Sequence, residues 1–230
     1  MKIDIITLFP QMLDSFFHSS IINRAIEKNL VSVNFINPRK FATDKHNTTD
    51  ERPFGGGPGM IMKAEPIFLA VESVKSNESI TILLSPSGLP FKQKDAEKIV
   101  LSNKHLIMIC GHYEGIDERV VDSIVDMEFS IGDYVLTNGA LAAAVVSDAI
   151  IRLIPGVIGA GEKGIKDESF STGILDYPQY TKPVKFRDME VPEILLSGNH
   201  ELISEWRRKK SIEKTKKNRP DLLSDYEKND

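Results

Sequence analysis

The chain has 230 residues, of which 41% are hydrophobic and 27% charged, and its mean hydropathy is −0.18. This composition is typical of a globular protein and argues against global disorder, while the length suits one large domain or two modest ones. A net charge of −4 excludes a uniformly basic nucleic-acid-binding protein, and a single cysteine excludes an intrachain disulfide framework.

Strands and helices are predicted to alternate through residues 1–155. Short apolar runs indicate strands at 3–8, 31–36, 80–84, 106–110 and 125–129. Amphipathic or alanine-rich stretches indicate helices at 13–27, 67–74, 93–101, 116–124 and 141–154, and a long polar, Gly-rich loop spans 37–59. This order predicts an α/β fold with a mostly parallel sheet and helices on both of its faces.

The pattern of residues changes after Pro155. The next stretch is rich in glycine and shows no hydrophobic periodicity, and three prolines follow it. Helical patterns resume at 200–217 and again after Pro220. We therefore expect an α/β domain at 1–158, a flexible linker at 159–172 and a small α-helical domain at 173–230. Basic residues crowd the last domain, at Arg207, Arg208, Lys209, Lys210, Lys214, Lys216, Lys217 and Arg219, and a local patch of this kind can bind phosphate even on an acidic protein.

Membrane and metal sites are not expected. The most apolar stretch, 139–154, is shorter than the ~18 residues that a membrane helix needs and carries Asp148 and Arg152. The first ten residues contain Asp4 and lack a signal peptide's apolar stretch, so a cytoplasmic location is expected. The five histidines show no metal-ligand spacing, which argues against zinc.

Two Gly-rich segments are candidates for ligand-binding loops. Residues 159–164 match GxGxxG, but they follow a helix rather than a strand, so we interpret them as linker. Residues 52–60, RPFGGGPGM, lack the Gly-Lys-Ser/Thr ending of a phosphate-binding loop. They are either a flexible surface loop or a place where the backbone passes close to a ligand or partner.

Three strand ends carry the main functional signal: LSPSG at 84–88, CGHYEG at 110–115 and SIGDYVLTNG at 130–139. In open α/β sheets, ligands bind beyond the carboxyl ends of strands. Glycines there expose backbone groups to a ligand, and Glu114 could face a cationic one. Any one of these loops could equally be an ordinary turn, but three in succession favour a site.

Several further side chains have both a functional and an ordinary interpretation. Arg152 can stabilise an oxyanion, and Asp167 or Glu168 can take a proton, although each is more often a solvated charge. His112 and Cys110 are interpreted as structural. Trp206 could stack on a base, but its helical spacing from Leu202 and Ile203 favours the core.

Taken together, these segments resemble the bacterial tRNA (guanine-N1)-methyltransferases of the SPOUT class. The resemblance runs nearly from end to end and is carried by IDIITLFPQML, ERPFGGGPGMIM, LLSPSG, CGHYEGIDERV, SIGDYVLTNGALA, RLIPGVIG, ESFSTGILDYPQYTKP and VPEILLSGNHELISEWRRKKS. It implies a deep trefoil knot toward the end of the first domain, which the physical prior against knots would not suggest. It also implies an antiparallel homodimer and S-adenosylmethionine as methyl donor; Mg²⁺ is a possible further cofactor.

The implied substrate is tRNA, held through its anticodon stem-loop. The implied reaction methylates N1 of the guanosine immediately 3′ of the anticodon, which supports reading-frame maintenance. The family's catalytic arginine falls on Arg152, and its general base falls on Glu168 or on Asp167, one residue upstream. Its cofactor-binding positions fall on Leu84, Ser85, Pro86, Gly88, Gly111, Tyr113, Glu114, Gly115, Ile131, Gly132, Tyr134, Leu136 and Gly139.

The chain departs from the family in the third loop, where the usual Gly-Gly-Glu-Leu-Pro is replaced by Asn138-Gly139-Ala140-Leu141-Ala142. We expect Asn138 to substitute for glycine because asparagine tolerates left-handed backbone. Two rival functions stay open. One is a related knotted methyltransferase acting on another RNA, such as ribosomal RNA. The other is a non-catalytic RNA-binding module, which only the altered third loop favours.

Overall fold

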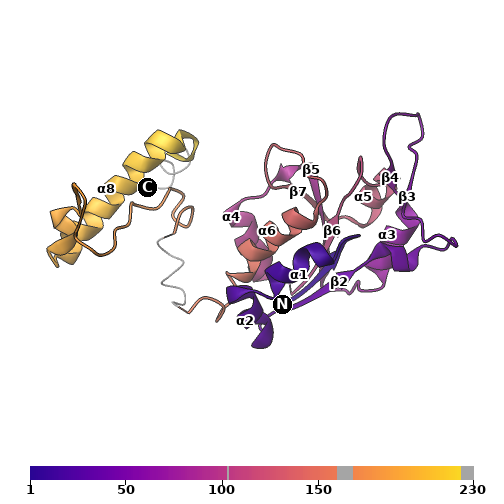
Figure 1. Cartoon of the computed structure of the whole chain (residues 1–230), viewed down its shortest axis with the longest axis horizontal. Helices are drawn as coiled ribbons and strands as arrows, with labels where there is room; N and C mark the ends of the chain where they lie inside the picture. Colours follow the sequence, from indigo (N-terminus) through magenta and orange to yellow (C-terminus); the bar gives the residue numbers. More distant parts are fainter. Residues whose placement is uncertain (103, 160–167, 224–230) are drawn as a thin grey trace. The chain divides into compact units, whose positions relative to one another are not determined.

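The computed structural model describes residues 1–102, 104–159 and 168–223 (Figure 1). The chain divides into two compact units, Met1–Gly159 and Ala160–Asp230, called unit 1 and unit 2 below. Within the described ranges, no helix has both the length and the apolar character needed to cross a lipid bilayer.

Unit 1 is built on a five-stranded parallel sheet with the strand order β2-β1-β6-β5-β7. The strands are β1 (Lys2–Ile6), β2 (Ser32–Ile36), β5 (Ser79–Pro90), β6 (His105–Cys110) and β7 (Met127–Ser130). β6 occupies the centre, and each of its residues is buried. A near-continuous apolar run is what a strand covered on both faces requires, and the predicted parallel sheet is confirmed.

Helices cover both faces of this sheet (Figure 1). One face carries α1 (Gln11–Phe17), α2 (Ser20–Glu27), α4 (Gln93–Ser102) and α6 (Ala140–Ile151), and the other carries α3 (Ala64–Glu72) and α5 (Glu118–Ile124). Side chains of β6 alternate between the two layers, with Leu106 and Met108 in the first core and Ile107 and Ile109 in the second. Full burial of one such side chain contributes about 1.5–3 kcal/mol, so these alternating residues hold both helical layers onto the sheet.

Two local expectations about unit 1 were wrong. The single helix expected at 13–27 is two helices, because Ser20 has a positive φ of 53° and the Ser19 hydroxyl donates to the Ser15 carbonyl. Serine side chains compete with the backbone for such bonds and interrupt helices. The long loop at 37–59 contains the 3₁₀ helix η1 (Pro38–Phe41) and the strand β3 (Asp50–Glu51), which pairs with β4 (Ile61–Met62).

Unit 2 contains α8 (His200–Asn218), whose first turn is capped by Asn199 through hydrogen bonds from the backbone N–H groups of Glu201 and Leu202. The helix expected after Pro220 is the 3₁₀ turn η3 (Pro220–Leu222) in the described part, and a further 3₁₀ turn, η2 (Glu193–Leu196), precedes α8. The unit also contains a hairpin of β8 (Lys185–Phe186) and β9 (Met189–Glu190), which the purely helical expectation missed. Strands of two residues are too short to show an alternating pattern.

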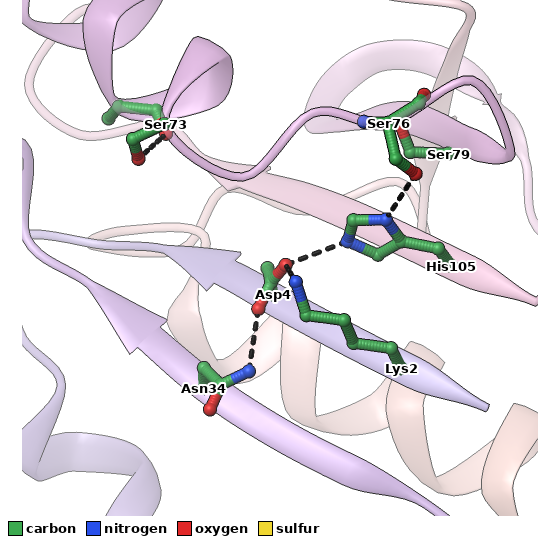
Figure 2. Close-up of polar contacts among 8 residues, drawn as sticks. Lys2, Asp4, Asn34, Ser73, Ser76, Ser79 and His105 are labelled. Carbon is green, nitrogen blue, oxygen red and sulfur yellow. Dashed lines mark hydrogen bonds and ion pairs between the residues drawn. The ribbon is translucent and has the colours of Figure 1, made fainter.

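A polar network centred on one buried carboxyl group links three strands of the sheet (Figure 2). Asp4 of β1 is fully buried, and its Oδ2 lies 2.7 Å from both Lys2 Nζ and His105 Nε2. Its Oδ1 accepts a 2.8 Å hydrogen bond from Asn34 Nδ2 of β2, while His105 Nδ1 lies 3.0 Å from Ser76 Oγ. A carboxylate in the core is tolerated because it is paired and hydrogen-bonded.

Candidate functional site

The three predicted loops meet around one cavity of about 530 Å³, which lies beside the carboxyl ends of β6 and β7 and the second half of β5. A volume of this size is typical of small-molecule sites. Twelve of the thirteen predicted cofactor residues line it: Leu84, Ser85, Pro86, Gly111, Tyr113, Glu114, Gly115, Ile131, Gly132, Tyr134, Leu136 and Gly139.

Gly88 is the predicted residue that does not line the cavity. A side chain there would bring its Cβ to 2.5 Å from the Phe129 backbone nitrogen. The first loop is also not a turn between a strand and a helix, because β5 continues to Pro90 and shifts register against β7 between Leu84 and Leu89. Gly88 therefore lets a bulged strand pass close to its neighbour.

The third loop lies directly against the second. The Gly139 N–H donates a 2.8 Å hydrogen bond to the Gly111 carbonyl, and His112 Nδ1 lies 2.9 Å from the Thr137 carbonyl oxygen. A Cβ on Gly139 would stand 2.8 Å from Cys110 Cα, a contact with backbone that cannot yield easily. Position 139 thus requires glycine.

The second loop holds a strained residue. Tyr113 has a φ of 59°, and its ring packs against His112 at 4.2 Å between centroids. His112 also meets Phe9 edge-on at 5.0 Å, which agrees with its interpretation as a structural residue. A bulky side chain held at positive φ is costly and is found where the surroundings fix a functional conformation.

The Gly-rich segment at 52–60 reaches this second loop at one end. The Glu114 N–H donates to the Met60 carbonyl at 3.0 Å, and a Cβ on Gly59 would stand 2.4 Å from the Glu114 side chain. Farther back, a Cβ on Gly55, Gly56 or Gly57 would meet nothing within 4 Å. The end of the segment therefore supports the cavity wall, while its middle is an open surface loop.

Charge around the cavity is of one sign. Glu114, Glu118 and Glu128 line it, and none of its lining residues in the described chain is lysine or arginine. Glu118 opens α5 and Glu128 lies within β7, positions that gave no sequence signal because only the fold brings them to the same edge. Three carboxylates without a cation suit a positively charged ligand.

Cys110, the last residue of β6, comes just before the cavity-lining Gly111 and is itself buried. Burial raises the pKa of the Cys110 thiol from 9.0 to about 12, so it stays protonated at neutral pH. A buried protonated thiol packs as a small apolar side chain. Among the residues that the structure describes, no group of His, Cys, Asp and Glu is arranged to hold a metal ion.

The altered third loop is accommodated differently from the expectation. Among the described non-glycine residues with positive φ, Asn138 is absent, so the left-handed conformation expected there was wrong. Its Oδ1 instead accepts a 2.9 Å hydrogen bond from the Ala140 N–H, two residues further along the chain, which is the Asx turn that asparagine commonly forms with its own backbone. Ala140 and Ala142 are both buried, and Ala142 lines the cavity.

The three predicted catalytic residues are distributed over the chain. Arg152 is the C-cap of α6 in unit 1, and its N–H donates to the Asp148 carbonyl at 3.1 Å. Glu168 is in unit 2, where its carbonyl accepts a 2.6 Å hydrogen bond from the Ser171 hydroxyl. Asp167 lies outside the described residues. The roles of all three stay predictions.

Comparison with known proteins matches residues 1–225 to the family described as tRNA (Guanine-1)-methyltransferase TrmD. A tRNA (guanine-N(1)-)-methyltransferase of Moorella thermoacetica is 53% identical over 228 residues, covering 97% of this chain and 90% of that protein. Those of Carboxydothermus hydrogenoformans and Geobacillus kaustophilus are 54% and 51% identical, covering 97% and 98% of this chain and 87% and 93% of theirs. The chain is therefore a member of the tRNA (guanine-1)-methyltransferase TrmD family.

Proposed function

We propose that the chain transfers the methyl group of S-adenosylmethionine to N1 of the tRNA guanosine immediately 3′ of the anticodon, and so supports reading-frame maintenance. The observation that carries this proposal is the convergence of the three family motifs on one cavity in unit 1, in a chain that matches the family over residues 1–225. The proposed place of this activity is the cytoplasm, where the tRNA substrate is found.

The chemistry of the cavity fits S-adenosylmethionine. Its volume of about 530 Å³ is sufficient for a ligand of this size, and its glycines leave backbone groups open to an adenine edge. When bound, S-adenosylmethionine supplies an electrophilic methyl group on a positively charged sulfonium. Glu114, Glu118 and Glu128 would favour that charge, and the twelve lining residues named above would hold the donor.

Methylation of guanine N1 needs a base, because N1 carries a proton near neutral pH and is then a poor nucleophile. The proposed base is Glu168 or Asp167, and the proposed partner of the charge that builds on O6 is Arg152. General-base catalysis typically contributes ~10²–10⁴-fold in rate. The target base must also leave the stack of the anticodon loop before it can react.

The general-base proposal is tested by Glu168→Gln, Asp167→Asn and the double substitution in single-turnover methylation with saturating tRNA and donor. We expect the rate of the correct single variant, and of the double variant, to fall by ~10²–10⁴-fold. Glu193→Gln, which removes an exposed carboxylate elsewhere in unit 2, is the matched control. Full activity in all three test variants would exclude a base at either position.

The knot and the homodimer are part of the same proposal. Support for the knot comes from membership of the family, and the structure shows its second and third loops in contact through the Gly139 N–H and the Gly111 carbonyl. Support for the homodimer comes from apolar side chains on α1 and α6 that are exposed to solvent: Met12 is 41%, Leu141 49% and Val145 52% exposed. Large exposed apolar patches typically mark an interface.

The reaction itself is tested with unmodified tRNA transcripts and methyl-labelled S-adenosylmethionine, with and without Mg²⁺. The proposal requires 1-methylguanosine in nuclease digests, and its loss when the guanosine 3′ of the anticodon is replaced. Methylation of ribosomal RNA in place of tRNA would support the related-methyltransferase alternative. A chain that binds tRNA but gives no calorimetric heat with S-adenosylmethionine would instead be an RNA-binding module.

A further inference from the structure

A second cavity, of about 520 Å³, lies entirely within unit 2, and the proposed methyl transfer does not use it. Its walls come from α8 and from the segments between Tyr177 and Leu196. The cavity is comparable in volume to the first one, so it is large enough for one planar heterocycle.

Two chain segments running side by side build its inner wall. Ile203, Trp206 and Arg207 share one face of α8, being three and four residues apart. Farther along the same helix, Thr215 Oγ1 accepts a 2.9 Å hydrogen bond from the Leu175 N–H. Leu175, Tyr177 and Tyr180 contact positions 215, 207 and 206 of α8, in that order. The segment 175–180 therefore runs antiparallel to α8.

Aromatic rings line this wall without closing it. Trp206 is only half-buried, and Tyr180 is 50% exposed beside it, with the two ring centroids 6.4 Å apart and their planes inclined at 55°. The helical spacing of Trp206 favoured the core, but the ring faces a cavity. Open aromatic faces next to cations are the platforms on which single-stranded nucleic acids stack their bases.

The charge of this cavity is opposite to that of the first. Lys182 and Arg207 line it, and no acidic residue does so in the described part of unit 2. The Arg207 guanidinium lies 4.7 Å above the Tyr177 ring, and a stacked guanidinium is held in place while its N–H groups stay directed at acceptors. α8 continues from there with Arg208, Lys209, Lys210, Lys214, Lys216 and Lys217. Glu213 pairs with Lys210 at 2.6 Å, so this part of the helix keeps an excess of positive charge.

We infer that this cavity receives one unpaired nucleobase of the RNA substrate, stacked on Trp206 and Tyr180, with Lys182 and Arg207 on the adjoining phosphates. The inference rests on the proposed function and extends it to a second RNA contact, separate from the guanine that is methylated. Its role is to bind and position RNA, so its loss affects the KM for tRNA rather than the rate at saturation.

The chain contains a single tryptophan, Trp206, so intrinsic fluorescence reports on this cavity alone. The experiment titrates the full-length protein with a tRNA transcript and with a short single-stranded oligoribonucleotide. A second oligonucleotide of equal charge, with abasic sites throughout, is the ligand control. We expect saturable quenching by the first two RNAs, since a base stacked on indole quenches it, and none by the abasic strand.

Tyr180→Ala tests the platform without removing the probe, and Tyr180→Phe tests whether an aromatic ring restores it. Base–aromatic stacking corresponds to an affinity ratio of about 5- to 150-fold, so Tyr180→Ala should raise the Kd and the KM for tRNA by that factor. The rate at saturating tRNA should be unchanged, and Tyr180→Phe should behave as wild type. Phe186→Ala, an exposed aromatic of the hairpin outside the cavity, should have no effect.

The outcomes separate this inference from the proposed function. Normal methylation with unchanged Trp206 emission at saturating tRNA would overturn the base pocket alone. Quenching equal to that of the abasic strand would reduce the site to a phosphate contact and overturn the nucleobase assignment. Emission that changes on dilution without RNA would show that a second copy of the chain covers the cavity, which would also overturn it. Quenching without any methyl transfer would support the pocket and contradict the proposed reaction.

Discussion

At Gly139, the absence of a side chain lets the second and third loops of the candidate site pack together. Its N–H bonds to the Gly111 carbonyl, and a Cβ there would meet Cys110 Cα at 2.8 Å. We expect Gly139→Ala to lower the free energy of unfolding by about 1–3 kcal/mol, as overpacking does, and to weaken S-adenosylmethionine binding because the two loops must separate. Chemical denaturation and calorimetry measure these effects, and Gly159→Ala, with nothing within 4 Å of its Cβ, is the control. Unchanged donor affinity in Gly139→Ala would show that the loop contact is not needed for binding.

Cys110 gives a pH-dependent prediction at the same scale. Its pKa is raised by burial from 9.0 to about 12 in the folded chain, so between these values the unfolded chain binds fewer protons than the folded one. The free energy of unfolding contributed by this group therefore falls as the pH rises from about 9 toward 12. In native protein near pH 8, we expect the thiol to react with a disulfide reagent only through unfolding, and to react at once in guanidinium. Rapid stoichiometric labelling without denaturant would contradict this.

At the scale of elements, the Asp4 network links β1, β2 and β6 (Figure 2). Leaving a buried polar group without its hydrogen-bond partner typically costs about 1–3 kcal/mol, and Asp4→Ala removes the partner of the buried His105 side chain, so we expect it to lower the free energy of unfolding by that amount. Lys2→Met should cost less than about 1 kcal/mol, because the lysine side chain is 41% exposed. Equilibrium denaturation measures both variants. The same measurement on His105→Ala and on the Asp4→Ala/His105→Ala double variant gives the coupling free energy between these two residues. Additive Asp4 and His105 effects would contradict a shared network.

The sheet strands could be predicted because their apolar runs are local and continuous, as in β6. The ligand loops could be predicted because glycines and polar residues follow those runs. The bulge of β5 against β7 could not, because it depends on Gly88 meeting Phe129, two residues far apart in sequence. Glu118 and Glu128 were missed for the same reason, since only the fold places them at one cavity.

At the scale of the whole molecule, opposite charges are gathered in different units. The first cavity is lined by three glutamates and the second by two cations. The net charge of −4 therefore does not reveal that the chain has one negative and one positive cavity. A cationic methyl donor and a polyanionic RNA can therefore be attracted by the same acidic protein. This separation explains why composition alone excluded a uniformly basic surface without excluding an RNA-binding function.

The exposed face of α1 and α6 provides the last prediction. Leu141 and Val145 lie one turn apart on α6 and are 49% and 52% exposed, and the Asn138 amide beside them reaches Met12 Sδ of α1 at 3.4 Å. If two chains pair through this face, Leu141→Lys combined with Val145→Lys places like charges in an apolar contact. We expect the double variant to sediment as a folded monomer while wild type sediments as a dimer. Leu101→Lys on α4, at a side chain that is 87% exposed, should stay dimeric. A double variant that remains dimeric would place the interface elsewhere on the chain.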